Sequence, residues 1–352
     1  MLFRTFFGSI AVTVATLAAA AWFGGPTALS LVAILAILEV SLSFDNAVIN
    51  ASVLVRMSRF WQRIFLTIGI LIAVFGMRLV FPLVLVAVTA ELSPLEAFRL
   101  AVEHPDQYQH TLEEAHPSIA AFGGVFLLMI FLDFVFEERQ IRWLHTIETA
   151  LARIGKLDQF SVVLALGALL LVAGTIADDP ETVLISGAAG LLTYLIVNGL
   201  GNLFAAGETA AGAGARGVVG KAAFFLFLYL EVLDASFSFD GVVGAFAISS
   251  NIIIIAAGLG IGAMYVRSIT VFLVNRGTLS EYVYLEHGAH WAIGSLAVVL
   301  LATIRFHVNE VITGLIGVAF IALAYTSSVA RNRRNRRPAA DEHDRQPDSI
   351  GA

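Results

Sequence analysis

The chain of 352 residues contains no cysteine. This absence excludes thiolate metal sites, disulfides and thiol catalysis, and it leaves the cellular compartment open. Charge is also scarce, because only 14% of the residues are charged whereas 58% are hydrophobic. These proportions exclude an ordinary soluble domain and indicate a polytopic membrane protein. The net charge of -6 gives no support for nucleic-acid binding. The motifs H-E-x-x-H and G-x-S-x-G are also missing, which argues against a membrane hydrolase and against an enzyme generally.

Long apolar runs predict an all-α membrane fold. A spanning helix needs about 20 mostly apolar residues, and runs of that length predict about ten membrane-spanning helices. The first run follows Arg4 and ends in small residues, so it is also consistent with a cleaved signal peptide, which would leave nine helices. The predicted segments are 5–23, 29–55, 63–90, 118–136, 159–177, 182–203, 219–248, 251–275, 288–304 and 309–329.

The distribution of Lys and Arg predicts the orientation in the membrane. Short cytoplasmic loops carry an excess of these residues, and they gather after every second predicted segment and in the tail. The opposite loops are acidic, above all the connection of about 27 residues that precedes the fourth segment. We therefore expect a multi-pass protein of the cytoplasmic membrane with a cytoplasmic C-terminus. The basic positions are Arg56, Arg59, Arg63, Arg139, Arg142, Arg153, Lys156, Arg216, Lys221, Arg276, Arg331, Arg333, Arg334, Arg336 and Arg337.

One motif occurs twice inside predicted membrane segments. Residues 39–48 read EVSLSFDNAV and residues 234–243 read DASFSFDGVV. Each copy has a carboxylate, Glu39 or Asp234, six residues before a shared aspartate, Asp45 or Asp240. The two segments cross the membrane in opposite directions, so the copies predict two inverted-topology repeats. Such repeats are typical of secondary transporters, whose substrate site lies near the midplane between the repeats.

The residue types predict a site for a divalent cation. A charge near the bilayer centre costs at least about 2.5 kcal/mol, so an intramembrane acid indicates a functional site. Carboxylate and amide oxygens suit hard ions such as Mg²⁺, Ca²⁺ or Mn²⁺. Two arginines, each nine residues after a glycine in the next segment, are predicted counter-charges: Arg78 and Arg267. The predicted ligands are Glu39, Asp45, Asn46, Asp234 and Asp240, with Glu231, Ser43, Ser238 and Asp133 as further candidates.

Helix geometry limits this site. Residues six apart lie about 240° around an ideal helix, so Glu39 and Asp45 cannot share a face. Either the acids bind in different layers or a helix unwinds, and we expect unwinding at Asp240-Gly241. A structural alternative stays open, in which Asp45 pairs with Arg267, or Asp240 with Arg78, to hold the bundle together.

Two histidines and one amide pair have mainly structural interpretations. His287 and His290 have the spacing of a metal pair, but histidines near a membrane interface are usually solvated, and we expect this of both. Asn198 and Asn202 favour hydrogen bonding between helices over contact with an ion.

The motif resembles that of a known family. EVSLSFDNAV and DASFSFDG, with Met77-Arg78 and Val266-Arg267 in the following segments, are similar to the TerC family of integral membrane proteins. The stretch Y-x-E-H-G-A-H at 284–290 resembles the subgroup known as domain of unknown function 475. The resemblance, which covers about residues 29–329, implies membership of the LysE-type transporter superfamily. It also implies export of manganese, with an acidic site on Glu39, Asp45, Asn46, Asp234 and Asp240.

The sequence therefore predicts a manganese exporter that works by alternating access, with the ion as substrate, no resident cofactor, and protons as a candidate counter-ion. Two alternatives stay open: a membrane assembly or metalation factor with structural Asp-Arg pairs, and an exporter of a small organic cation or amino acid. The predicted parts are an N-terminal segment (1–28), a first repeat (29–158), a connecting helix pair with a cytoplasmic loop (159–218), a second repeat (219–329) and a basic, then disordered tail (330–352).

Overall fold

The computed structural model is all-helical in the part of the chain that it describes. It describes the backbone of residues 2–155, 157, 159–210, 218–246, 248–306 and 308–343, without the side chains of 2–4, 42, 45, 205–210, 239, 240, 310, 311 and 336–343. The helices in chain order are α1 (Leu2–Leu42), α2 (Phe44–Leu54), α3 (Arg59–Ile64), η1 (Phe65–Gly69), η2 (Ile72–Val80), α4 (Phe81–Thr89), α5 (Pro94–Glu103), α6 (Pro105–Phe136), α7 (His145–Ile154), α8 (Phe160–Thr175), α9 (Pro180–Ala210), α10 (Gly220–Phe246), α11 (Ile252–Arg276), α12 (Thr278–Glu281), α13 (Leu285–Thr303) and α14 (Glu310–His343).

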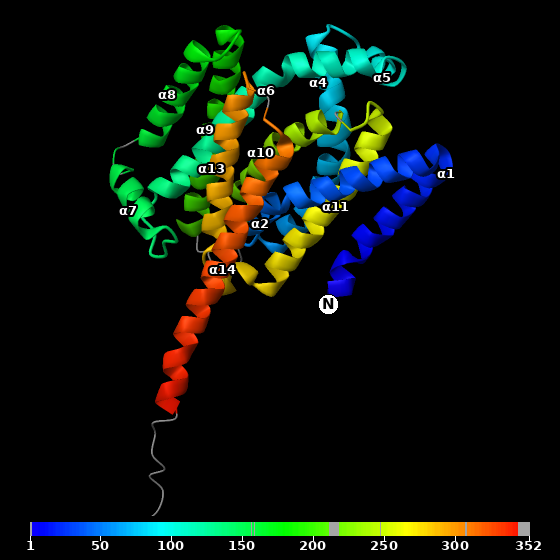
Figure 1. Ribbon diagram of the computed structural model, residues 1–352. Helices are drawn as coiled ribbons and strands as arrows, with labels where there is room; N and C mark the ends of the chain where they lie inside the picture. The colour runs from blue at the N-terminus through cyan, green and yellow to red at the C-terminus, as the bar shows by residue number, and fades with distance from the viewer. Residues whose placement is uncertain are drawn as a thin grey trace, which may run out of the picture.

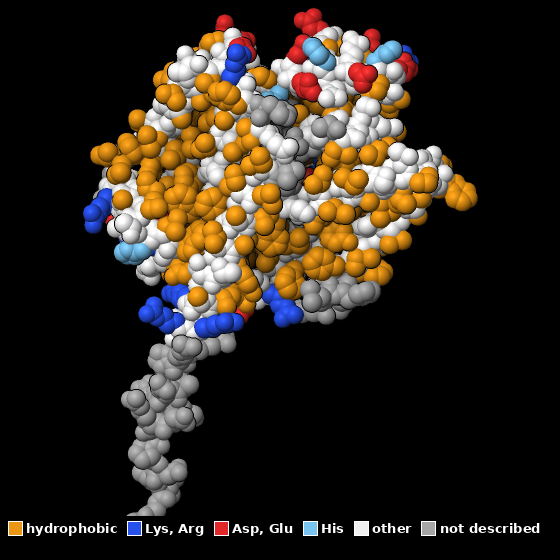
Figure 2. Space-filling view, in the orientation of Figure 1, with side chains coloured by type: hydrophobic (Ala, Val, Ile, Leu, Met, Phe, Trp, Pro, Cys, Tyr) orange, Lys and Arg blue, Asp and Glu red, His pale blue; other side chains and the backbone are white. Residues whose placement is uncertain are grey.

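The apolar helices make this a multi-pass membrane protein. Eight helical stretches within the described residues are long and apolar enough to cross a membrane, and α8 is apolar but shorter. Large hydrophobic side chains such as Leu171, Ile185 and Leu192 are exposed on these helices, and hydrophobic side chains cover most of the face in Figure 2. Lipid is the solvent that such a surface requires.

The first two predicted segments share one kinked helix. α1 bends at Gly25, whose φ of 70° and ψ of -166° lie outside the helical region. Pro26 follows and cannot donate a backbone hydrogen bond to the preceding turn. Figure 1 shows the two arms of α1 meeting at a sharp angle. The second arm continues past a break at Ser43 into α2, so two arms and α2 together replace the predicted segments 5–23 and 29–55.

Two predicted irregular regions are helical. The acidic connection before the fourth segment forms α5, which begins with a capping box between Ser93 and Glu96, and the first turns of α6. At the other end, α14 continues to His343, so the predicted tail of residues 330–352, basic and then disordered, is helical as far as that residue. Strong helix formers such as arginine and alanine explain this continuation. The predicted loop residues 211–217 lie outside the described residues.

Close helix packing surrounds the centre of the bundle. Leu127 and Met129 of α6 and Ile293 of α13 belong to the largest buried apolar cluster. Glycines allow the helices to approach: Gly190 of α9 faces the Phe122 backbone, and Gly294 of α13 faces the Phe131 ring. Small residues at such contacts are typical of membrane helices. This framework fixes α6, α9, α10 and α13, and α2 and α11 pack beside it.

Candidate functional site: a buried acidic cluster around Arg78

The first acids of the two motif copies meet at one arginine. Arg78 Nη2 donates to Glu39 Oε1 at 2.5 Å, and Arg78 Nη1 lies 3.9 Å from Asp234 Oδ2. Arg78 is 2% exposed, Glu39 5% and Asp234 7%. Asn46 Nδ2 donates to Asp234 Oδ1 at 2.8 Å. Four polar side chains from α1, α2, η2 and α10 thus form one buried network between residues far apart in the sequence.

The local backbone explains how these groups converge. Glu39 lies one turn before the break at Ser43, which redirects the chain between α1 and α2. Arg78 lies in η2, a π-helix of nine residues, and it also donates to the Ala73 carbonyl at 2.6 Å. The wider turn of a π-helix shifts side chains around the axis, and such segments are frequent at functional sites.

A small cavity lies beside the network. Its volume is about 30 Å³, and its polar lining includes Asn50, Arg78, Glu231, Asp234 and Arg267. A cavity of this size has room for water or a small ion, but not for a larger organic molecule. Three lining residues each keep a buried oxygen that accepts no hydrogen bond from the groups that the structure describes: Asn50 Oδ1, Glu231 Oε2 and Asp234 Oδ2. Buried oxygens of this kind are costly and need a partner.

Glycines leave room for the acidic side chains. A Cβ added to Gly262 would overlap Glu39 Cγ, and one added to Gly69 would lie 2.8 Å from Glu231 Oε1. Gly241 faces Glu39 in the same way, at 3.1 Å from Oε2. The expectation of unwinding at Asp240-Gly241 is therefore wrong: α10 continues to Phe246, and Gly241 serves close approach instead. The break lies at Ser43, in the first copy of the motif.

We predict that Gly262→Ala destabilises the protein by about 1–3 kcal/mol, because the added methyl must displace Glu39 or α11. The matched control is Gly167→Ala on α8, where nothing lies within 4 Å of the added Cβ. Alanine is the better helix former there, so this control should be neutral or stabilising. Thermal unfolding in detergent measures both, and equal midpoints for the two variants would contradict the close packing on Glu39.

The remaining predicted ligands have different outcomes. The side chains of Asp45 and Asp240 lie outside the described residues, although their backbones belong to α2 and α10. Ser238 is buried, and its hydroxyl has no hydrogen-bond partner among the described residues. Asp133 lies away from the network and accepts a hydrogen bond from Tyr194 at 2.6 Å. Ser43 is the residue between α1 and α2, and its side chain makes no cap hydrogen bond.

Sequence reasoning missed Asn50 and the glycine at 262. Asn50 lies one turn after Asn46 on α2, so the same face of that helix was a usable signal. Gly262 has no local signal, because its role depends on contact with Glu39 from another helix. For the amide pair, Asn198 donates to the Tyr194 hydroxyl at 3.2 Å, but that contact lies within α9.

The charge of the cluster defines what it can bind. Glu39, Glu231 and Asp234 carry three negative charges when ionised, and Arg78 and Arg267 carry two positive charges. Among the side chains that the structure describes, no three acids or histidines are grouped as in a metal centre. Instead, the guanidinium of Arg78 lies between Glu39 and Asp234 and takes the place of a cation.

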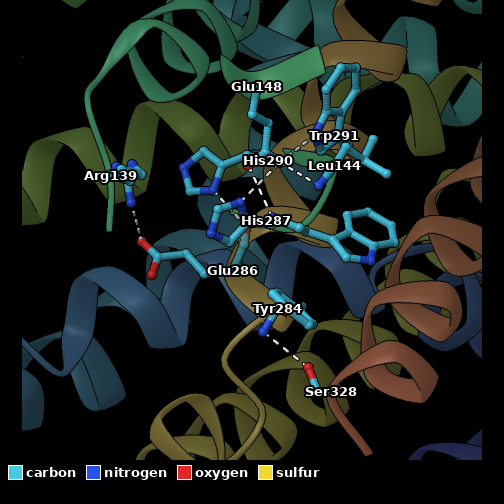
Figure 3. Close-up of polar contacts among 10 residues, drawn as sticks. Arg139, Leu144, Glu148, Tyr284, Glu286, His287, His290, Trp291 and Ser328 are labelled. Atoms are coloured by element: carbon cyan, nitrogen blue, oxygen red, sulfur yellow. Dashed lines mark hydrogen bonds and ion pairs between the residues drawn. The ribbon is translucent and has the colours of Figure 1, made fainter. Parts of the chain in front are cut away.

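A second polar cluster lies around residues 284–290, the Y-x-E-H-G-A-H stretch (Figure 3). Glu148 of α7 is buried and lies 3.1 Å from His287 Nδ1, and it accepts hydrogen bonds from Trp291 Nε1 and from the Trp143 and Leu144 amides. Both histidines are buried, so the expectation that they are solvated is wrong. The reason is that Glu148 of α7 contacts His287, while Phe134 of α6 stacks on His290.

His290 has a packing role of its own. Its ring stacks on Phe134 with centroids 3.6 Å apart, and its Nδ1 lies 2.8 Å from the Glu286 carbonyl. Arg139 lies over the same Phe134 ring and within 3.6 Å of the Glu286 carboxylate. The His287 ring also contacts Phe134, edge to face at 5.2 Å, so the two histidines share this ring and differ in their hydrogen-bond partners.

We predict an acid-sensitive contribution from Glu148. Burial alone would raise its pKa, but the contacts with His287, Trp291 and Leu144 outweigh burial and hold the pKa below 4.5. The ionised form therefore stabilises the fold at higher pH, and that contribution disappears as pH falls through the lowered pKa. The unfolding midpoint of the wild type should fall more between about pH 5 and about pH 3 than that of Glu148→Gln. Glu103→Gln, at an exposed site, is the control, and equal acid sensitivity of all three proteins would contradict this role.

Comparison with known proteins identifies one family. The family described as "Protein of unknown function (DUF475)" matches residues 44–335. No curated protein matches the chain. No solved structure matches it either.

Proposed function

The chain belongs to the DUF475 family, and we propose that it is a divalent-cation transporter of the cytoplasmic membrane that exports Mn²⁺ by alternating access. One observation carries this proposal: the buried oxygens of Asn50, Glu231 and Asp234, which accept no hydrogen bond from any described group, lie beside a cavity of about 30 Å³. Oxygen atoms without donors are the ligands that hard divalent cations use. The small volume favours an ion over an organic cation or amino acid.

Exchange of Arg78 for the ion gives the site its chemistry. With Arg78 in place, one guanidinium balances part of the charge on Glu39 and Asp234. When Arg78 moves away, these two carboxylates present a charge of -2, which matches one divalent cation. Asn46 already bonds Asp234 and would hold that carboxylate in position. Arg78 thus stabilises the site between transport cycles, and the proposed ligands are Glu39, Asn46, Asp234 and the flanking acids Asp45, Asp240 and Glu231.

The distribution of surface charge supports the orientation that this function needs. In Figure 2 Lys and Arg gather at the lower end of the molecule, near the exit of α14, whereas Asp and Glu gather at the upper end, over α4 and α5. Basic residues prefer the cytoplasmic side, so the lower end is the proposed cytoplasmic face. The inverted repeats inferred from the two motif copies are consistent with transport between these faces.

Export requires energy. Moving a divalent ion outward costs about 4.6 kcal/mol per 100 mV, at about 2.3 kcal/mol per charge. Proton uptake by the same buried carboxylates would supply the coupling, because each can carry a proton inward after releasing the ion. The choice of Mn²⁺ and of the outward direction rests on the resemblance to the TerC family.

Flux into proteoliposomes tests this function. The purified protein should move Mn²⁺ and exclude at least one of Mg²⁺, Ca²⁺ and Zn²⁺, and Asp45→Asn and Asp240→Asn should both reduce that flux. Protein-free liposomes give the background. Absence of flux for all four ions, or flux that neither substitution alters, would contradict the proposal.

The assembly-factor alternative is favoured by one specific contact. Arg78 is fully buried and paired, as a residue that only holds helices together would be. In that case the pairing, and not ion binding, would be the purpose of Glu39 and Asp234. The charge-neutral double variant described in the Discussion separates the two functions.

A further inference from the structure

Arg267 lies inside the apolar helix α11. Among the side chains that the structure describes, which do not include those of Asp45 and Asp240, none forms a hydrogen bond or ion pair with Arg267, whereas its counterpart Arg78 pairs with two acids. The side chain is half-buried. An arginine at membrane depth needs an acid, water or a headgroup as its partner.

Arg267 lines two separate spaces. One is the cavity of about 30 Å³ beside Glu231 and Asp234. The other is a groove of about 560 Å³ between the first arm of α1 and α11, whose polar lining includes Thr5, Ser9, Ser268 and Asn275. Ser9 and Ser268 are buried against each other, so the polar groups that need water in this groove are Arg267 and the exposed Asn275.

The groove has a defined wall and direction. Ser9 Oγ donates to the Met264 carbonyl at 2.8 Å and lies 2.6 Å from Ser268 Oγ, which fixes the first arm of α1 against α11. Asn275 is one residue from the end of α11, and Thr5 lies near the N-terminus, at the lower end of the molecule in Figure 1. Arg267 lies eight residues before Asn275 on α11, which places it about 12 Å away from Asn275, toward the interior, given a rise of 1.5 Å per residue. The groove thus runs inward from the end where basic residues gather.

We propose that this groove is the aqueous access route to the acidic cavity and that Arg267 is the gate residue between them. This inference rests on the proposed transport function and adds the route and the gate. The positive charge of Arg267 repels a cation in the groove until the side chain turns toward the acids. Arg78 and Arg267 hold equivalent positions in the helices that follow the two motif copies, and Arg267 lines the groove while Arg78 is engaged with Glu39 and Asp234.

The absence of native cysteine allows a direct test of the groove. Val271→Cys and Asn275→Cys place a thiol on the groove wall, and Leu192→Cys places one on an exposed apolar face of α9. A charged, membrane-impermeant thiol reagent is applied to membrane vesicles of each orientation. We expect both groove variants to react at least about tenfold faster than Leu192→Cys, from the face that carries the C-terminal tail, because thiols react in water and not in lipid. Equal rates, or reaction from the opposite face, would overturn the groove as an aqueous route.

Flux measurements on the same proteins test whether the ion passes through the groove. Labelling of Val271→Cys should reduce Mn²⁺ flux at least about tenfold, while treated Leu192→Cys keeps its flux. A labelled groove with unchanged flux would overturn the access route. Absence of flux in the untreated proteins would count against the transport function alone, since the labelling rates decide on the groove independently.

The gate is tested by its charge. Arg267→Ala should raise passive Mn²⁺ leak about tenfold in the absence of a proton gradient, whereas Arg267→Lys keeps it low, because a positive side chain is an electrostatic barrier to cations. A merely structural arginine would give lower flux in both variants and no leak, which would overturn the gate.

Discussion

Asp234→Asn is expected to reduce divalent-cation flux by roughly 30-fold or more, because loss of one buried charged partner costs at least about 2 kcal/mol and each 1.4 kcal/mol is a factor of ten. The substitution keeps the shape of the side chain, and the new amide can still accept from Asn46 Nδ2. What it removes is the charge that faces Arg78 and, in the proposed cycle, the ion. Flux in proteoliposomes gives the result.

Ser236→Ala is the matched control for this substitution. Ser236 lies two residues further along α10 and is buried as well, but its hydroxyl donates to the Val232 carbonyl of its own helix at 2.9 Å. Its removal should leave flux within about twofold, since such bonds within one helix contribute little. Equal flux in Asp234→Asn and Ser236→Ala would show that the charge at 234 is not used in transport.

Arg78→Met should have the largest effect on stability. It leaves Glu39 and Asp234 buried without a counter-charge, and breaking a buried pair in this way costs about 3–5 kcal/mol. Added Mn²⁺ should restore part of that loss, because a ligand that binds only the folded protein stabilises it. Thermal unfolding with and without the ion measures both effects. A Mn²⁺-induced shift no greater than in the wild type would contradict the exchange of Arg78 for the ion.

The double variant Arg78→Met with Glu39→Gln separates an ion site from structural pairing. Removal of both members of a buried pair is often close to neutral for stability, so the double variant should be more stable than Arg78→Met alone. As a transporter it should still be inactive, because a proposed ligand is missing. A stable double variant that transports no ion but keeps the wild-type function in cells would favour the assembly factor, in which the pair only holds helices together.

Part of the site could be predicted from the repeated motif. The paired positions of Glu39 and Asp234 in the two copies identified them as equivalent acids, and the structure brings both to Arg78. The sequence could not decide which acid each arginine meets, because pairing of Arg78 with Asp240 satisfied the same pattern. The choice depends on the turn of η2, and i→i+5 hydrogen bonding has no clear sequence signal.

Contacts between distant segments account for the rest. The histidines at 287 and 290 have the pattern of an interfacial pair, and only the position of α7 shows that Glu148 buries one of them. The kink at Gly25 is different, because a Gly-Pro pair inside an apolar run is a local signal that was available in the sequence. The break at Ser43 has no such signal, and packing determined which polar groups meet.

Equilibrium binding of Mn²⁺ to the purified protein tests the central claim most directly, that Glu39 and Asp234 bind the ion in exchange for Arg78. Arg78→Met should bind Mn²⁺ more tightly than the wild type, because no guanidinium competes for the two carboxylates. Addition of Asp234→Asn to that variant should weaken binding by roughly 30-fold or more, the equivalent of at least about 2 kcal/mol. Mn²⁺ affinity that is the same in all three proteins would contradict the account.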